Sequence, residues 1–177
     1  MHRRPLLEAL ARHTPHDAEE AEMRDRMQAF VESTIDCFER SHLAGHVTGS
    51  AFIVSPTRDA VLLMHHRKLN RWLQPGGHCD GDPEFVAVTC REVLEETGLG
   101  LEPVSTDIYD VDIHWIPERK QVPGHWHYDV RLLFVADPAT PLLINAESTA
   151  LAWVPLQDLH AKNSDRSILR MAEKLAI

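Results

Sequence analysis

The sequence predicts an α/β/α sandwich, in which a mixed β-sheet is covered by helices and preceded by an N-terminal helical extension. Apolar residues before position 43 recur with the 3.6-residue period of helices, and from Gly45 onward they alternate with the two-residue period of strands. A helical segment then interrupts the strands after Gly76 and Gly77. We divide the 177 residues into a helical extension over 1–43 and a main domain with a C-terminal helix over 44–177.

Composition and charge limit the class of protein. The chain is 44% hydrophobic and 25% charged, as in soluble globular proteins. Its formal net charge of −9 argues against binding to a nucleic-acid polymer or an acidic membrane surface. No apolar run approaches the ~20 residues of a membrane span, and the three cysteines lack metal or redox spacing. We therefore expect a cytoplasmic protein that binds no membrane.

The extension is predicted to form two helices. The first covers residues 2–13, and the second follows Asp17, which fits an N-cap, and ends near Ser41. An apolar stripe runs along the second helix and consists of Met23, Met27, Phe30, Val31, Thr34 and Phe38. The stripe packs on the main domain, forms the surface of a homodimer or serves as a lid, and the sequence leaves these alternatives open.

Strands are predicted on both sides of the central helix. Residues 47–55 and 61–66 form a hairpin around a turn at 56–59, and a basic loop follows at 67–71. Further strands are expected within 105–116 and over 125–137, 142–144 and 150–154, with a hairpin loop around 117–124. A helical turn over 156–160 precedes a final helix that is capped by Ser164 and runs through Leu175.

The central helix has clear start and stop signals. Asp82 fits the N-cap, Pro83 fits the first turn, and Gly98 fits the position that ends the helix, so the helix has about 15 residues. The buried side is expected to comprise Phe85, Val86, Val88, Thr89, Val93 and Leu94.

Three carboxylates, Glu92, Glu95 and Glu96, occupy positions i, i+3 and i+4 of this helix and share one face. Three like charges repel one another, so such a face is favourable when it holds a divalent cation that prefers oxygen ligands, such as Mg²⁺ or Mn²⁺. The alternative is a solvated, salt-bridged helix face.

The spacing of the motif resembles the Nudix box. Gly77, Arg91-Glu92, an aliphatic residue, Glu95-Glu96, Gly98 and a final aliphatic residue match its pattern, and the resemblance extends over residues 45–160. It implies a metal-dependent Nudix hydrolase that cleaves the diphosphate bond of a nucleoside diphosphate linked to another moiety, by water attack on phosphorus. It also implies metal ligation by the Gly77 carbonyl, Glu92, Glu95 and Glu96, with Arg91 orienting the glutamates.

Pro83 stands where the family pattern has its first glutamate. Either Glu84 substitutes for that residue, or Arg91 pairs with Glu95. The departure motivates a second hypothesis, a non-catalytic Nudix-fold module that binds or senses a nucleotide. An isomerase on the same fold, acting on an isoprenoid diphosphate, is less favoured, because no cysteine and glutamate are placed for that chemistry.

The general base is either a box glutamate, for which Glu96 is a candidate, or Glu147 on a later loop. The alternative for Glu147 is that it is an exposed acidic residue of a loop, without a catalytic role. Candidate substrate contacts are the two basic residues Arg67 and Arg71, which would meet an outer phosphate, and His78.

A histidine-rich strand provides one more candidate substrate contact. His127 alternates with His125 and Asp129 on one strand face, whereas Trp126 and Tyr128 should point to the other face and pack in the core. A strand histidine is more often a structural residue than a ligand contact. The sequence does not identify which nucleoside diphosphate derivative is the substrate.

Overall fold

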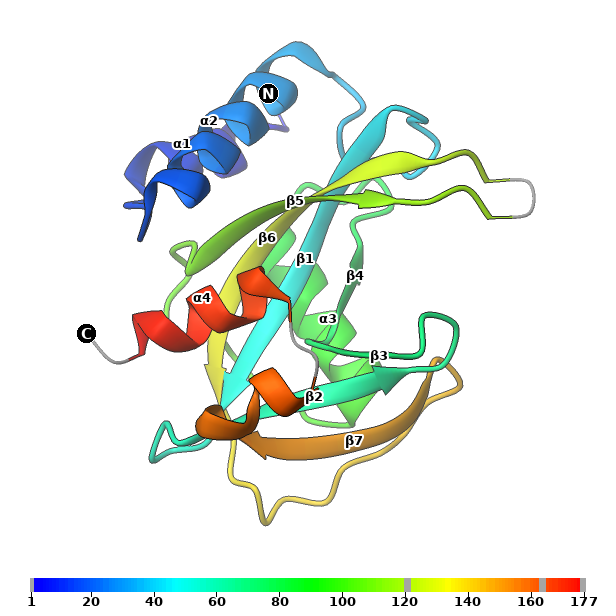
Figure 1. The fold of residues 1–177 in the computed structure, drawn as a ribbon. Coiled ribbons are helices and arrows are strands. Elements are labelled where there is room, and N and C mark those ends of the chain that lie inside the picture. The colour runs from blue at the N-terminus through cyan, green and yellow to red at the C-terminus, as the bar shows by residue number, and fades with distance from the viewer. Residues whose placement is uncertain (1, 120–121, 163–164, 176–177) are drawn as a thin grey trace.

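The computed structural model describes residues 2–119, 122–162 and 165–175 and shows a curled mixed sheet with helices on both faces (Figure 1). The strands run in the order β3-β2-β1-β6-β5, with β4 paired to β1 and β7 paired to β2. Their bounds are β1 Gly45–Val54, β2 Ala60–His66, β3 Arg71–Leu73, β4 Gly76–His78, β5 Asp110–Ile116, β6 His125–Val135 and β7 Ser148–Pro155. The sheet is mixed because β1 and β6 are parallel, whereas the other pairs are antiparallel.

Strand β1 is buried along its whole length and separates two apolar clusters. Val47, Ala51 and Ile53 belong to the cluster that contains helix α3 (Phe85–Thr97) and the N-terminal helices. Phe52 and Val54 belong to the cluster that contains helix α4 (Arg166–Lys174). Alternate residues of the strand therefore serve opposite faces of the sheet, which confirms the predicted sandwich.

The N-terminal helices are α1 (Arg4–Arg12) and α2 (Ala18–Ser33), and they pack on the main domain. Asp17 caps α2 as expected, because its carboxylate accepts a hydrogen bond from the Glu20 N–H at 2.8 Å. The Phe30 ring stacks on Tyr128 of β6 at 3.9 Å between centroids, and Tyr128 packs against the apolar cluster of α2 and α3 on the face opposite His127, as predicted. No helix among the described residues is long and apolar enough to cross a membrane.

The predicted extension of α2 to Ser41 is wrong. Thr34 adopts an extended conformation and ends the helix. It lies about one turn beyond Val31, the last buried residue of α2. Phe38 is nevertheless buried, and the Cys37 carbonyl accepts a hydrogen bond from the Val47 N–H at 2.7 Å. The apolar residues after Thr34 therefore belong to a turn that packs against β1 and continue the stripe only in sequence.

Both predicted hairpins are present, through the pairing of Val54 with Val61 and of β5 with β6. Positions 120 and 121 of the second hairpin loop lie outside the described residues. The predicted strand at 142–144 is wrong: this segment is a loop, in which Leu143 and Ile144 are exposed and the Leu143 N–H donates to the Thr97 carbonyl at 2.8 Å.

The C-terminal end agrees with the prediction in outline. Two short 3₁₀ turns, Leu156–Asp158 and His160–Lys162, replace the single helical turn expected over 156–160. The final helix is α4, and its N-cap is Asp165, whose carboxylate accepts from the Ile168 N–H at 3.1 Å. Ser164 was expected in that role, which is wrong; Ser164 itself lies outside the described residues.

Helix α3 has 13 residues and begins two positions later than the sequence indicates. Glu84 is its N-cap, whereas the Asp82 carboxylate accepts from the Glu84 N–H at 3.0 Å and closes the turn that leads into the helix. Gly98 ends the helix in the left-handed conformation, with φ of 77°, as predicted. Leu94 was expected to be buried but is 52% exposed, because its side chain points about 100° around the helix from buried Val93.

Candidate active site

Strand β4 brings the glycine pair directly against the carboxylates of helix α3. A Cβ atom on Gly77 would collide with the carboxylate of Glu92, so a larger residue at this position would displace that carboxylate. The Gly76 N–H donates a hydrogen bond to Glu96 Oε2 at 2.8 Å. The glycines are therefore required for close approach of the backbone to the carboxylates.

Glu96 is 5% exposed and Glu92 is half-buried, which is unusual for carboxylates. Burial, together with the charges of Glu92, Glu147 and Glu95, raises the pKa of Glu96 to about 8, whereas the Gly76 hydrogen bond opposes the rise. Burial and the neighbouring Glu95 charge also raise the pKa of Glu92. The site thus concentrates negative charge that a bound cation would neutralise.

Glu95 differs from the other two carboxylates because it is exposed. Its charge still acts on both Glu92 and Glu96. Its backbone carbonyl accepts a hydrogen bond from Asn145 Nδ2 at 3.2 Å. One face of α3 thus carries two sheltered carboxylates beside one that is open to solvent.

Arg91 contacts neither of the two partners considered from the sequence, Glu84 or Glu95, within the described part of the chain. Its guanidinium lies 3.9 Å from an Asp82 carboxylate oxygen and 3.7 Å from one of Glu92. It also donates to the His78 carbonyl at 3.4 Å. Asp82, the residue before Pro83, therefore supplies the second carboxylate next to Arg91.

The loop that carries Glu147 is tied to the site from two sides. The Asn145 side chain that bonds to helix α3 also accepts from the Glu147 N–H at 2.9 Å. The Arg67 guanidinium donates to the carbonyls of Ala146 and Ser148, each at 3.0 Å. Glu147 is exposed, and its charge reaches Glu92 and Glu96. The structure therefore brings both general-base candidates to one place.

The structure separates the candidate substrate contacts. The Arg67 guanidinium holds the loop carbonyls just described, whereas the Arg71 guanidinium lies 3.7 Å from an Asp165 carboxylate oxygen. His78 directly follows Gly77, and its ring lies 5.0 Å from that of His127, measured between centroids. The two histidines thus share one polar surface, and the two arginines do not.

That polar surface lies on the sheet face opposite α3. Buried Asp129 accepts hydrogen bonds at 2.8 Å from Thr48 Oγ1, Ser50 Oγ and Arg131 Nε. A Cβ on Gly76 would lie 2.3 Å from Ser50 Oγ, so this surface borders the glycine pair from the other side. Strand β4 therefore separates the carboxylate site from a buried polar network.

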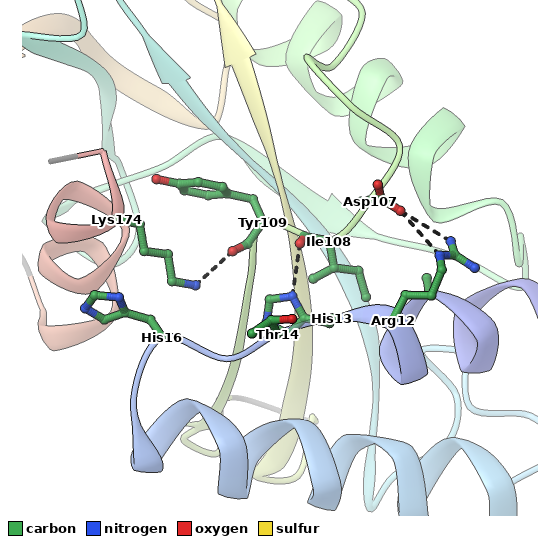
Figure 2. Close-up of a pocket in the computed structure, with 9 residues that line it drawn as sticks. Arg12, His13, Thr14, His16, Asp107, Ile108, Tyr109 and Lys174 are labelled. Carbon is green, nitrogen blue, oxygen red and sulfur yellow. Dashed lines mark hydrogen bonds and ion pairs between the residues drawn. The ribbon is translucent and has the colours of Figure 1, made fainter. Parts of the chain in front are cut away.

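A cavity of about 570 Å³ lies elsewhere, between the α1–α2 connection, the segment before β5 and helix α4 (Figure 2). Its basic residues are already paired. Lys174 Nζ donates to the Tyr109 carbonyl at 2.8 Å and to Asp110 Oδ1 at 2.6 Å, and His13 Nδ1 donates to the Ile108 carbonyl at 3.0 Å. Because these groups are already hydrogen-bonded within the protein, we do not place the substrate here.

The donor set at α3 and β4 suits a hard divalent cation. It combines the carboxylates of Glu92, Glu95 and Glu96 with the backbone of Gly77, where a Cβ atom would collide with the Glu92 carboxylate. Mg²⁺ and Mn²⁺ prefer such oxygen ligands. Compensation of the crowded negative charge would also restore an ordinary pKa to Glu96.

Comparison with known proteins places this geometry in a family. The family model described as the NUDIX domain matches residues 46–174. The MutT protein from Methanosarcina mazei Go1 has the same fold, with a TM-score of 0.58 and 19% identity over 76% of this chain and 95% of that chain. None of the curated proteins compared with the chain matches it.

Two further solved structures share the fold. The C. elegans Ap4A hydrolase, in a binary complex, has a TM-score of 0.58 and 15% identity over 73% of this chain and 94% of that chain. The NUDIX domain of Shewanella oneidensis NrtR, complexed with ADP ribose, has a TM-score of 0.57 and 18% identity over 84% and 95%. Since the family model covers well over half of the sequence, the chain belongs to the Nudix family, whose hydrolases are generally pyrophosphatases that act on nucleoside diphosphate derivatives.

Proposed function

We propose that this protein is a Mg²⁺- or Mn²⁺-dependent diphosphohydrolase that cleaves the phosphoanhydride bond of a nucleoside diphosphate linked to another moiety, by water attack on phosphorus. The observation that carries the proposal is the pair of sheltered carboxylates, Glu92 and Glu96, held against Gly76 and Gly77. A solvated, salt-bridged helix face would leave these carboxylates exposed and near their ordinary pKa. Here burial raises the pKa of both groups.

We assign metal ligation to Glu92, Glu95, Glu96 and the Gly77 carbonyl. A bound divalent cation would neutralise the diphosphate oxygens and lower the pKa of the attacking water. Arg91 orients the cluster, because its guanidinium contacts Glu92 and the His78 carbonyl while Asp82 holds it from the other side.

For the general base we favour Glu96 over Glu147. Glu96 Oε2 is fixed by the Gly76 N–H, which holds the carboxylate in one orientation from which it could take a proton from water. Glu147 is exposed on a loop, so its carboxylate is held in place only through the backbone contacts of that loop. A residue that must accept a proton in a defined direction is better placed on the helix.

The substrate class remains a nucleoside diphosphate derivative. The structurally similar proteins named above include an Ap4A hydrolase and a domain complexed with ADP ribose, so both compounds belong in a test panel. We propose that His78, adjacent to the glycine pair, contacts the substrate. Arg67 and Arg71 remain candidates for the outer phosphate if substrate binding releases them from their present partners.

A hydrolysis screen tests the proposal. The purified chain is incubated with ADP-ribose, Ap4A, nucleoside diphosphate sugars and modified nucleoside triphosphates, with Mg²⁺, with Mn²⁺ or with excess EDTA. We expect at least one compound to be cleaved, only with metal, and Glu95→Gln and Glu96→Gln each to lose most of the activity. Glu102→Gln, which removes an exposed carboxylate beyond the helix, is the charge-matched control and should retain activity.

Two results would contradict the hydrolase. One is full activity in both glutamine variants. The other is tight binding of a panel compound by calorimetry without turnover under any metal, which would instead favour the nucleotide-sensing module that the Pro83 departure suggests.

A further inference from the structure

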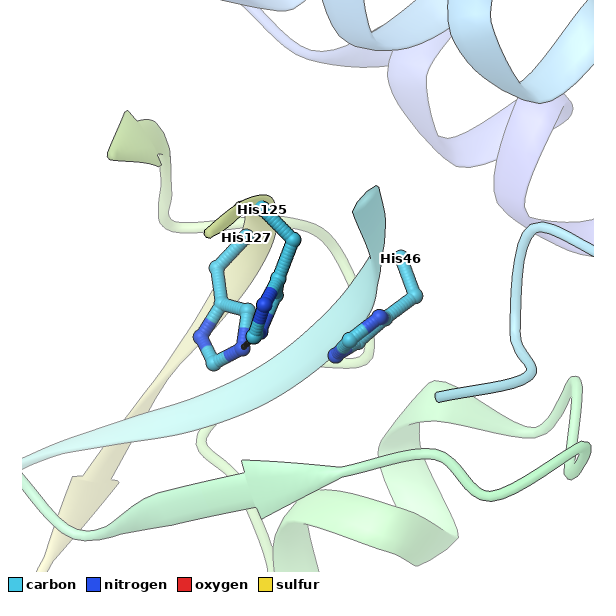
Figure 3. Close-up of side chains that lie close together, drawn as sticks. All are labelled: His46, His125 and His127. Atoms are coloured by element: carbon cyan, nitrogen blue, oxygen red, sulfur yellow. Dashed lines mark hydrogen bonds between the residues drawn. The ribbon is translucent and has the colours of Figure 1, made fainter. Parts of the chain in front are cut away.

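Three histidines from two strands converge on the polar face of the sheet (Figure 3). His46 lies on β1 and is in register with His127 on the parallel strand β6, and His125 is two residues before His127. One ring nitrogen of each histidine lies within 4.8 Å of one from each of the other two. Among the described residues this is the only group of three histidine, cysteine or acidic side chains with ligand atoms so close together.

His46 is a buried histidine whose ring makes no hydrogen bond of ordinary geometry within the described part of the chain. The residue is 2% exposed, and both of its ring nitrogens are buried. Buried polar groups are almost always paired, because an unpaired one has lost its contacts with water without replacement. The neighbours of its ring are the imidazoles of His78, His125 and His127, at 4.9 to 5.1 Å between centroids. His46 therefore lacks a partner that a metal ion would supply.

His125 is already oriented as a metal-binding histidine is. Its Nδ1–H donates to the Pro123 carbonyl at 2.9 Å, which fixes the ring and leaves the Nε2 lone pair directed at the cluster. Its Nε2 is hydrogen-bonded to His127 Nε2 at 3.3 Å, and a bound ion would replace the shared proton. Two nitrogens bound to one tetrahedral Zn²⁺ lie about 3.3 Å apart, given Zn–N bonds of 2.0–2.1 Å.

The cluster suits a cation that prefers nitrogen. Burial and the neighbouring imidazoles lower the pKa of His46 to about 4 and that of His127 to about 2, so both rings keep a free lone pair at neutral pH. Neutral imidazole suits Zn²⁺ and similar transition metals, whereas Mg²⁺ prefers oxygen. His127 is only partly buried, so an ion has a path of entry.

We propose that His46, His125 and His127 bind one divalent transition-metal ion of the Zn²⁺ class, at a site separate from the carboxylates of α3. The fourth coordination position is open to water or an anionic oxygen. This assignment makes His127 a metal ligand in place of the substrate contact expected from the sequence. It does not depend on the hydrolase activity, because its ligands and its test do not involve the carboxylates.

The test uses Zn²⁺ itself and a chain whose carboxylate site has been removed. The variant Glu92→Gln/Glu95→Gln/Glu96→Gln is stripped with a chelator, dialysed against Zn²⁺ and analysed for bound metal. We expect one Zn²⁺ per chain. In the same background, His46→Asn or His127→Asn should weaken Zn²⁺ binding at least about 100-fold, and His160→Asn, at an exposed histidine outside the cluster, should leave it unchanged.

If a histidine variant does not fold, the proposal is tested by spectra of the carboxylate-free variant, whose three histidines are intact. Co²⁺ in place of Zn²⁺ should give the visible bands of tetrahedral coordination, and long-range ¹H–¹⁵N spectra should show three imidazoles changing on Zn²⁺ addition. The proposal is overturned if the carboxylate-free chain retains no stoichiometric Zn²⁺, if folded His46→Asn binds it as before, or if no imidazole signal changes.

Discussion

Replacement of Glu96 by Gln should change how the stability of the metal-free protein depends on pH. The Glu96 carboxyl is buried against Gly76, with its pKa raised from 4.5 to about 8. The folded state therefore holds this proton more tightly than the unfolded state does. The destabilisation that follows is absent below the unfolded pKa, grows as the pH rises and is complete above the folded pKa.

The size of the effect follows from the two pKa values. Linkage predicts that the free energy of unfolding of Glu96→Gln, relative to that of the wild type, rises by about 4 kcal/mol between about pH 5 and about pH 9. A glutamine can still accept the hydrogen bond from the Gly76 N–H, so the comparison isolates the charge. Excess Mg²⁺ should reduce the difference, because a cation bound at Glu92 and Glu96 stabilises the ionised form.

Urea unfolding in excess EDTA, followed by circular dichroism at a series of pH values, measures this difference. Glu102→Gln serves as the control, since its side chain is exposed, and should run parallel to the wild type. If the difference between Glu96→Gln and the wild type changes by less than about 0.5 kcal/mol over the range, Glu96 has an ordinary pKa and the electrostatic reasoning about the site fails.

Two other substitutions test the packing around the site. Gly77→Ala should lower the metal-dependent hydrolysis rate at least about tenfold, because its Cβ would displace the Glu92 carboxylate. Gly100→Ala is the control and should keep the rate, because its Cβ would meet nothing within 4 Å. Equal rates in the two variants would refute the role of Gly77. Arg170→Met should reduce the free energy of unfolding by about 2–3 kcal/mol, because it removes two hydrogen bonds of 2.9 Å to the fully buried Asp110, which keeps Lys174 and Arg131 as partners. Denaturant unfolding measures this change, and a loss below about 1 kcal/mol would show that the pair is not important for stability.

Local patterns were sufficient to predict much of the fold. The helix that ends at Gly98, the cap of α2 at Asp17 and the hairpin between β1 and β2 depend on residues close together in sequence. Predictions failed where tertiary contacts decide. Leu143 is apolar but has no partner strand, and Phe38 is buried through a turn that a helical period does not describe.

The candidate site shows the same division. The carboxylates on α3 and the glycine pair follow from their spacing, but the Asp82 contact with Arg91 depends on the turn before the helix. His46 was not singled out from the sequence, because only the parallel register of β1 and β6 brings it beside His127, 81 positions later. The signal available in the sequence was the alternation of the polar residues His46, Thr48 and Ser50 along this strand.

Hydrolysis in water labelled with heavy oxygen tests the proposed reaction most directly. With Mg²⁺ or Mn²⁺ present, a panel diphosphate should be cleaved and the label should appear in a phosphate group of one product, with the rate in Glu96→Gln lower by about 100-fold or more. Cleavage that proceeds equally in excess EDTA, label that is absent from phosphorus, or an undiminished rate in Glu96→Gln would contradict the assignment of these carboxylates to a metal-dependent attack of water on phosphorus.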